Sequence, residues 1–201
     1  DLMITVTPES RDHRMGAVFD QAYEGWIAQS VQPSVIGRYL IDPATGVVKD
    51  TAIVTDVDRL WGGILATTDV THPAARAHLS QFWYAGSGFD PDLVPEEWWR
   101  LYGTATDGIV APSELPDRAL PGTLARFDVN DMTVVDVWSY PGGSFPSPPT
   151  FVPRRGAIGQ EEGYVVAVVH QDGPKEIQVF DAAYLASGPV ARAGSETFNP
   201  N

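Results

Sequence analysis

The chain has 201 residues, of which 43% are apolar and 19% charged, and its formal net charge is -13. This composition is that of a globular protein, and the negative charge disfavours binding to nucleic acid or to an anionic membrane surface. The absence of cysteine excludes disulfides, iron–sulfur clusters and thiolate zinc sites, and it fits a reducing compartment, so we expect a cytoplasmic protein. No apolar run is long enough to cross a bilayer, so we expect no transmembrane segment.

Strand-like runs begin close to the N-terminus. Residues 1–6 carry neither an initiator Met nor a signal-peptide core, so we expect the chain to start partway through a longer protein. Residues 36–41 form one arm of a predicted hairpin, with a turn over 42–46 and a returning strand over 47–49. The turn contains Asp and Gly, which bond nearby backbone groups and tolerate positive φ, respectively.

The same design of strand, polar turn and returning strand recurs later in the chain. The arm at 163–170 is nearly all apolar, which predicts that both of its faces are covered. Repeated hairpins indicate an all-β fold, either a propeller or a sandwich. The three later hairpins pair 124–128 with 133–138, 163–170 with 176–180, and 177–181 with 189–192.

A less regular region occupies residues 60–121. It has a candidate helical turn after Pro73, a candidate short helix over 91–101 and a Pro-rich loop over 113–121. No low-complexity linker separates it from the strands. We therefore expect residues 1–201 to form a single domain or part of one, with 60–121 as a partly helical cap or insertion.

Three segments have more distinctive residue identities. The strongest lies within residues 149–192 and contains Pro-Thr-Phe-Val-Pro-Arg, Glu-Glu-Gly-Tyr, Val-Phe-Asp-Ala-Ala-Tyr-Leu and Gly-Pro-Val-Ala-Arg. The second covers residues 37–48, and the third is Gln-Ala-Tyr-Glu-Gly at 21–25. In order and spacing these segments resemble the C-terminal half of the carotenoid cleavage oxygenase family.

This resemblance implies part of a seven-bladed β-propeller. It also implies a non-haem Fe(II) enzyme that cleaves a double bond of an apolar substrate, namely a carotenoid, an apocarotenoid or a stilbene-like compound. In the complete protein of this family, four histidines on different blades hold the iron. The implied partner of this chain is the N-terminal half of the same propeller, on the same or a separate chain.

The histidines of this chain do not match the ligand positions of the family. Val18 stands where the resemblance places the third ligand, and valine cannot bind a metal. Pro148 stands where the family has a Glu. We therefore expect that this chain alone does not hold the iron. The four histidines are His13, His72, His78 and His170.

Glu24 is the residue that the resemblance assigns to a functional role. It matches a carboxylate that accepts a hydrogen bond from a ligand histidine and so orients its ring. The alternative is a solvated glutamate in a turn. Arg154 and Arg155 are expected to pair with carboxylates on the blade surface. Five aromatic residues either line an apolar tunnel or pack in the core: Trp61, Phe82, Trp83, Trp98 and Trp99.

Three hypotheses remain open on the sequence. The first is the C-terminal part of an iron-dependent dioxygenase. The second is a metal-free propeller relative that acts as a binding or scaffold subunit, which the identities of Val18 and Pro148 motivate. The third is an unrelated all-β binding module, such as a sandwich.

Overall fold

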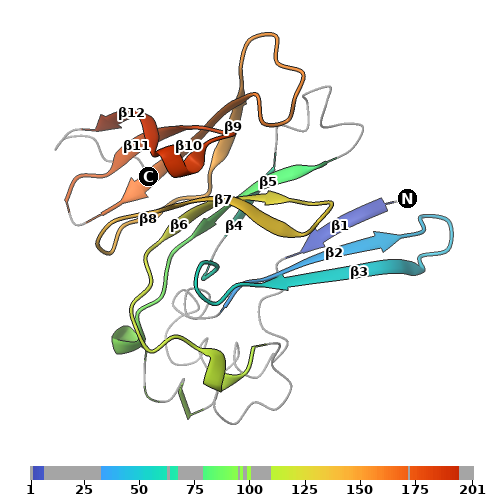
Figure 1. Cartoon of the computed structure of the whole chain (residues 1–201), viewed down its shortest axis with the longest axis horizontal. Coiled ribbons are helices and arrows are strands. Elements are labelled where there is room, and N and C mark those ends of the chain that lie inside the picture. The colour runs from blue at the N-terminus through green and yellow to red at the C-terminus, as the bar shows by residue number, and fades with distance from the viewer. Residues whose placement is uncertain are drawn as a thin grey trace. The chain divides into compact units, whose positions relative to one another are not determined.

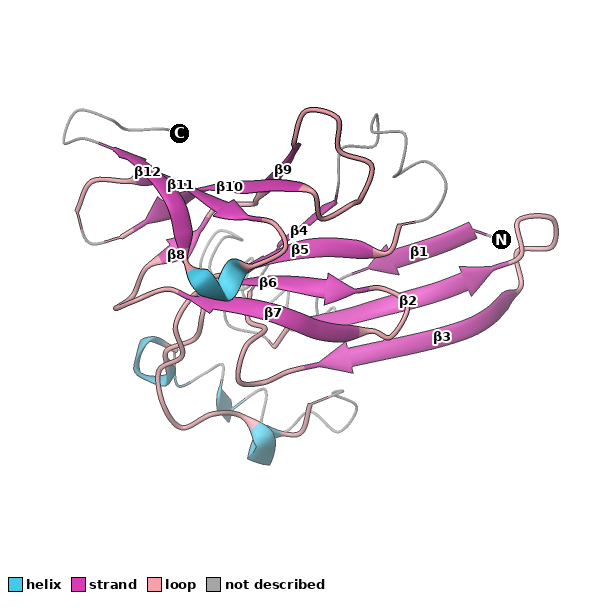
Figure 2. Cartoon of the chain, turned by 45° about the horizontal axis from the view of Figure 1, so that its top comes forward, coloured by secondary structure: helices cyan, strands magenta, loops and turns pink. Residues whose placement is uncertain are grey.

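The fold of the chain is built almost entirely from antiparallel strands (Figure 2). Among the residues described, the helical elements with defined bounds are three single 3-10 turns, and no helix is long and apolar enough to cross a membrane. The chain divides into two compact units, which are taken separately below. The computed structural model describes residues 2–6, 33–62, 64–67, 79–94, 96, 99–100, 110–171 and 173–194.

The first unit, Asp1–Gly62 and Gly88–Leu120, contains a three-stranded sheet. Its strands pair in chain order, and the β2–β3 hairpin confirms the hairpin predicted over 36–49. The turn forms because Asp42 accepts a hydrogen bond from the Ala44 N–H (2.9 Å) and because Gly46 adopts a positive φ of 71°. The strands are β1 (Leu2–Val6), β2 (Val35–Ile41) and β3 (Val48–Thr55).

The described part of residues 88–120 in the first unit consists of turns, an isolated bridge and short helical segments. It includes the 3-10 turns η2 (Pro91–Leu93) and η3 (Pro112–Glu114). Phe89 and Leu120 form an isolated bridge, and the Phe89 ring stacks on Trp61 with 4.0 Å between ring centroids. Within the helix predicted over 91–101, the structure has this 3-10 turn at Pro91–Leu93 and α-helical backbone at Glu96, Trp99 and Arg100.

The second unit, Gly63–Ser87 and Pro121–Asn201, contains two sheets. In the first, the four strands pair in chain order, and the β6–β7 hairpin is the one predicted over 124–138. The strands β4 and β5 lie inside the range 60–121, where the sequence showed no strand pattern. The strands are β4 (Ile64–Thr67), β5 (Gln81–Gly86), β6 (Thr123–Asp128) and β7 (Thr133–Ser139).

The second sheet of this unit corresponds to the distinctive segment at 149–192. Its order is β12-β11-β10-β8, and β9 pairs with the first half of β10. Both predicted hairpins, β10–β11 and β11–β12, are confirmed. The elements are β8 (Phe145–Pro146), β9 (Thr150–Pro153), β10 (Gly163–His170), β11 (Glu176–Asp181), the 3-10 turn η4 (Leu185–Ser187) and β12 (Pro189–Gly194).

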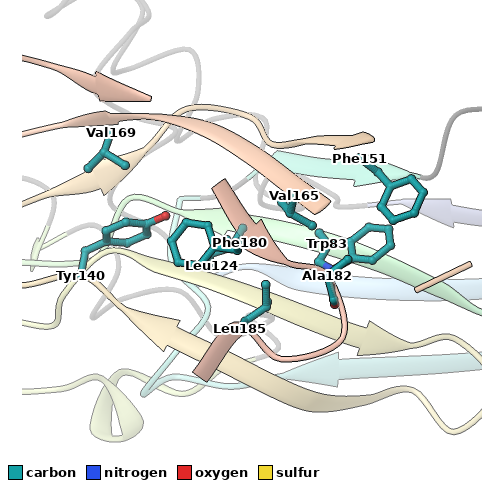
Figure 3. Packing of buried hydrophobic residues seen from close by; sticks show 9 residues of the cluster. All are labelled: Trp83, Leu124, Tyr140, Phe151, Val165, Val169, Phe180, Ala182 and Leu185. Carbon is teal, nitrogen blue, oxygen red and sulfur yellow. Dashed lines mark hydrogen bonds between the residues drawn. The ribbon is translucent and has the colours of Figure 1, made fainter. Parts of the chain in front are cut away.

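The core of the second unit lies between these two sheets (Figures 1 and 3). One face of β10 is buried in it, whereas the other face is half-buried. The prediction that both faces of this strand are covered is therefore confirmed for one face, and for the half-buried face it stays a prediction. The core residues are Trp83, Leu124, Tyr140, Phe151, Val165, Val169, Phe180, Ala182 and Leu185.

Candidate functional site

The distinctive residues of the last sheet have identifiable structural roles. A Cβ on Gly163 would lie 2.5 Å from the Val152 carbonyl oxygen, so only glycine fits where β9 and β10 come together. Arg154 forms an ion pair with Asp181 (2.5 Å) and lies over the Tyr164 ring, 5.0 Å from its centroid. The prediction that Arg154 pairs with a carboxylate is confirmed.

The turn between β11 and β12 is anchored on the preceding sheet. The Trp83 indole N–H donates to the Ala182 carbonyl (3.2 Å; Figure 3). Asp136 on β7 accepts hydrogen bonds from the Leu185 N–H (2.5 Å) and the Ala186 N–H (3.2 Å). The string Asp-Ala-Ala-Tyr-Leu therefore marks the place where one sheet docks on the next.

The loop between β9 and β10 makes a second connection to that sheet. Gln160 accepts hydrogen bonds from the backbone N–H (2.9 Å) and the hydroxyl (3.1 Å) of Ser80. Gln81 donates to Glu161 (3.4 Å) and accepts from Arg126 (2.8 Å). These polar contacts fix the loop against the start of β5.

The same loop is closed by a carboxylate. Glu162 accepts a hydrogen bond from the Ile158 N–H (3.0 Å). Hydrogen bonding to the N–H groups of Ile158 and Gly159 lowers the pKa of Glu162. The carboxylate therefore stays ionised across the neutral range and holds the loop closed.

Most residues of the predicted site lie outside the described part of the chain. Glu24 and Val18 are among them, so the proposed role of Glu24 stays a prediction. The same applies to His13, His72 and His78.

His170 is the histidine whose surroundings the structure describes. It ends β10, and its ring stacks on Phe145 with centroids 5.0 Å apart and planes 6° apart. Burial lowers the pKa of His170, and the charge of Lys175 lowers it further. His170 therefore ends the first arm of the β10–β11 hairpin, where its ring is half-buried against Phe145.

The described residues do not fit an iron site. In this part of the chain, no group of three or more His, Asp or Glu side chains is placed to hold a metal ion. Pro148, which lies between β8 and β9, is exposed and brings no carboxylate to this position.

The aromatic residues that the structure describes pack in cores. Phe82 and Trp83 are 1% and 0% exposed; Phe82 stacks on Phe127 (4.9 Å) and Trp83 on Phe151 (4.7 Å). Trp61 is also buried, in the first unit. For these three residues the packing interpretation holds and the tunnel interpretation does not. Trp99 contacts Phe89 edge-on, and Trp98 lies outside the described residues.

One feature of the core was not predicted from the sequence. The Tyr140 hydroxyl and the Gln178 side-chain carbonyl are both buried and have no hydrogen-bond partner among the described residues. Burial raises the pKa of Tyr140 far above its usual value, and the nearby charge of Arg192 opposes this effect. No local pattern could reveal it, because the Tyr140 ring, which follows β7, packs edge-on against Phe180 of β11 in the other sheet (6.2 Å).

Comparisons with known proteins agree with this architecture. The family model described as Retinal pigment epithelial membrane protein, RPE65, matches residues 7–200. No curated protein matches the chain.

Solved structures with the same fold include a variant of Synechocystis apocarotenoid oxygenase, ACO (TM-score 0.52, 16% identity, 82% of this chain and 28% of that chain). A cobalt-substituted Synechocystis ACO has a TM-score of 0.52 at 15% identity, over 82% of this chain and 28% of that one. An ACO/RPE65 chimera reaches 0.54 at 15% identity, over 96% of this chain and 33% of that one.

The likeness to these structures shows the fold. The antiparallel sheets described above are part of a β-propeller, and the chain spans about a third or less of the length of these neighbours. The family match extends from residue 7 to residue 200. The chain therefore belongs to the carotenoid cleavage oxygenase family.

Proposed function

We propose that this chain is the C-terminal part of a non-haem Fe(II) dioxygenase that cleaves a double bond of a carotenoid, apocarotenoid or stilbene-like substrate. The observation that carries this proposal is the family match over residues 7–200. Because the chain spans only 28% of the length of its first structural neighbours, we assign the activity to the complete protein. In such a reaction the double bond breaks, and each of its carbons receives one oxygen atom of dioxygen, which gives two carbonyl products.

The contribution of this chain to that activity is structural. Two sheets are locked together through the Trp83–Ala182 and Asp136–Leu185 hydrogen bonds. A rigid scaffold of this kind supports a site whose groups must be held in place to a fraction of an ångström. Glu24 would add a carboxylate that accepts a hydrogen bond from a histidine N–H and fixes that ring.

The iron would be held by histidines outside the described residues. In support of this, no suitable group of side chains comes together in the described part of the chain. It also agrees with Val18 and Pro148, which replace residues that the resemblance places near the metal. When bound, the metal would supply activation of dioxygen.

A reconstitution experiment tests the proposal. The chain is purified alone and together with the N-terminal part of the propeller. The iron content of each sample is measured by elemental mass spectrometry. Loss of polyene absorbance reports cleavage. We expect stoichiometric iron and oxygen-dependent cleavage only in the assembled protein. Turnover by the isolated chain with bound iron would contradict the division of roles proposed here.

The same experiment separates the enzyme from a metal-free relative. If the assembled protein is folded but binds no iron and cleaves no substrate, a binding or scaffold subunit is favoured. A Glu24→Gln variant refines the result, because glutamine keeps the size of the side chain and removes its charge. We expect this variant to lower turnover in the assembled protein and to leave its folding unchanged.

A further inference from the structure

Three polar atoms around Phe180 are enclosed in the core of the second unit without a hydrogen-bond partner among the described residues. They are the Tyr140 hydroxyl, the Gln178 side-chain carbonyl oxygen and the Trp138 indole N–H. Tyr140 and Gln178 are only 2% and 3% exposed. A polar group that is buried in this way loses its hydration, and it normally gains a protein or water partner in return.

Register and ring packing bring Tyr140 and Gln178 together. Gln178 and Phe180 lie on the buried face of β11, since side chains alternate along a strand. The Tyr140 ring packs edge-on against Phe180 (6.2 Å), and its hydroxyl points toward Phe180 (Figure 3). Burial raises the pKa of Tyr140 and the charge of Arg192, the residue opposite Gln178 on β12, opposes this effect. The hydroxyl therefore lies beside the Gln178 amide.

The orientation of the Gln178 amide is fixed by its other end. The amide N–H donates to the Glu176 carboxylate (3.1 Å), and the same carboxylate pairs with Arg192 (3.4 Å). If the amide were turned over, its carbonyl oxygen would face this carboxylate, and two acceptors cannot bond to each other. Gln178 therefore presents an acceptor, and not a donor, to the space beside Tyr140.

The wall of the site on β10 supplies no partner for these groups. Ala167 lies opposite Gln178, and it is flanked on the same face by Val165 and Val169. All three side chains are buried and apolar. The methyl group of Ala167 is the smallest of them, so the space over this face of β10 is greatest next to Gln178.

We propose that one buried water molecule occupies this position and links the two sheets of the second unit through Tyr140 and Gln178. The water donates a hydrogen bond to the Gln178 carbonyl oxygen and accepts one from the Tyr140 hydroxyl. The Trp138 N–H is a further donor for its oxygen, since the Trp138 ring packs edge-on against Tyr140 (6.5 Å). Buried waters typically make about three hydrogen bonds of this kind.

The same groups argue against other occupants. A metal cation would meet the Tyr140 and Trp138 donors and the charge of Arg192. An anion would meet the carbonyl oxygen of Gln178. A larger molecule would hold apart the side chains that close the site, whereas Tyr140 and Gln178 are at most 3% exposed. Water is small and neutral, and it both donates and accepts.

Relaxation dispersion of the water oxygen nucleus tests the proposal, because its amplitude counts the waters that tumble with the protein. The full chain is compared with the double variant Tyr140→Phe/Gln178→Met, which keeps the size of both side chains. We expect the double variant to hold one long-lived water fewer. The control Tyr184→Phe/Gln171→Met makes the same two changes at an exposed tyrosine and in the β10–β11 turn, and it should lose none.

The stability of the fold is not the readout, because the entropy lost by an immobilised water offsets much of what its hydrogen bonds contribute. A crystal structure of the full chain gives the position directly. We expect a water oxygen about 2.7–3.2 Å from both the Tyr140 hydroxyl and the Gln178 carbonyl oxygen, and none there in the double variant.

Three outcomes overturn the proposal. The first is an equal number of long-lived waters in the full chain and the double variant. The second is a direct hydrogen bond from Tyr140 to Gln178 in the crystal, and the third is a protein group from elsewhere in the chain at this position. Neither measurement needs iron or substrate, so the result does not depend on the proposed dioxygenase activity.

Discussion

Replacing Asp136 with Ala should release the β11–β12 turn from the preceding sheet. The carboxylate accepts hydrogen bonds from the N–H groups of Leu185 (2.5 Å) and Ala186 (3.2 Å). A hydrogen bond to a charged group contributes about 1.5–3 kcal/mol, and because Asp136 is only half-buried, water replaces part of this in the variant. We therefore expect Asp136→Ala to lower the free energy of unfolding by about 2 kcal/mol.

Urea unfolding and hydrogen exchange measure this effect together. With a urea dependence of about 2 kcal/mol/M, the midpoint should fall by about 1 M. The N–H groups of Leu185 and Ala186 should also exchange faster than in the unaltered chain. Asp136→Asn keeps one acceptor oxygen and should show a smaller loss, and Asp131→Ala, at an exposed turn, serves as the control.

The reasoning would be refuted by unchanged exchange at these two amides. Such a result would mean that the turn is held by its own 3-10 hydrogen bonds, such as that from the Gly188 N–H to the Leu185 carbonyl (2.9 Å). A midpoint equal to that of the Asp131→Ala control would lead to the same conclusion.

Three further changes test other parts of the fold by urea unfolding. Gly163→Ala should lower stability by about 2–3 kcal/mol, because the new Cβ would lie 2.5 Å from the Val152 carbonyl oxygen; a variant as stable as the unaltered chain would contradict this. Tyr140→Phe should leave stability unchanged or raise it by about 1 kcal/mol, because the buried hydroxyl has no partner among the described residues, and a clear loss would reveal one. The pKa of His170 is lowered in the fold, so the stability this ring contributes is present above the unfolded pKa and is lost as the pH falls through the folded pKa. The stability difference between the unaltered chain and His170→Gln should therefore change in favour of the variant between pH 7.5 and pH 5, and a constant difference would contradict the lowered pKa.

The hairpins could be predicted from the sequence because their signals are local. The Asp42 turn and the turns at the ends of β6 and β11 each combine a polar bend with strand-forming arms on both sides. Strand β5 was not predicted, because five of its six residues are buried and its sequence shows no alternation of apolar and polar residues. Its neighbours in the sheet, and not its own pattern, make it a strand.

The candidate site could be predicted only in part. The resemblance assigned Glu24, which lies outside the described residues, and it identified the segment at 149–192. It did not reveal why that segment is distinctive, because the explanation involves Trp83 and Asp136 on another sheet. The buried Tyr140 hydroxyl, which has no hydrogen-bond partner among the described residues, likewise depends on how the two sheets pack.

The hydrogen bond between Trp83 and Ala182 also has a consequence for synthesis of the chain. Trp83 and Ala182 are 99 residues apart in the sequence, so during synthesis the Trp83 indole lacks this partner until the last sheet has left the ribosome. At about 5–20 residues per second this wait lasts about 5–20 s. Over that interval the apolar face of the β4–β7 sheet lacks the later sheet that covers it in the folded unit.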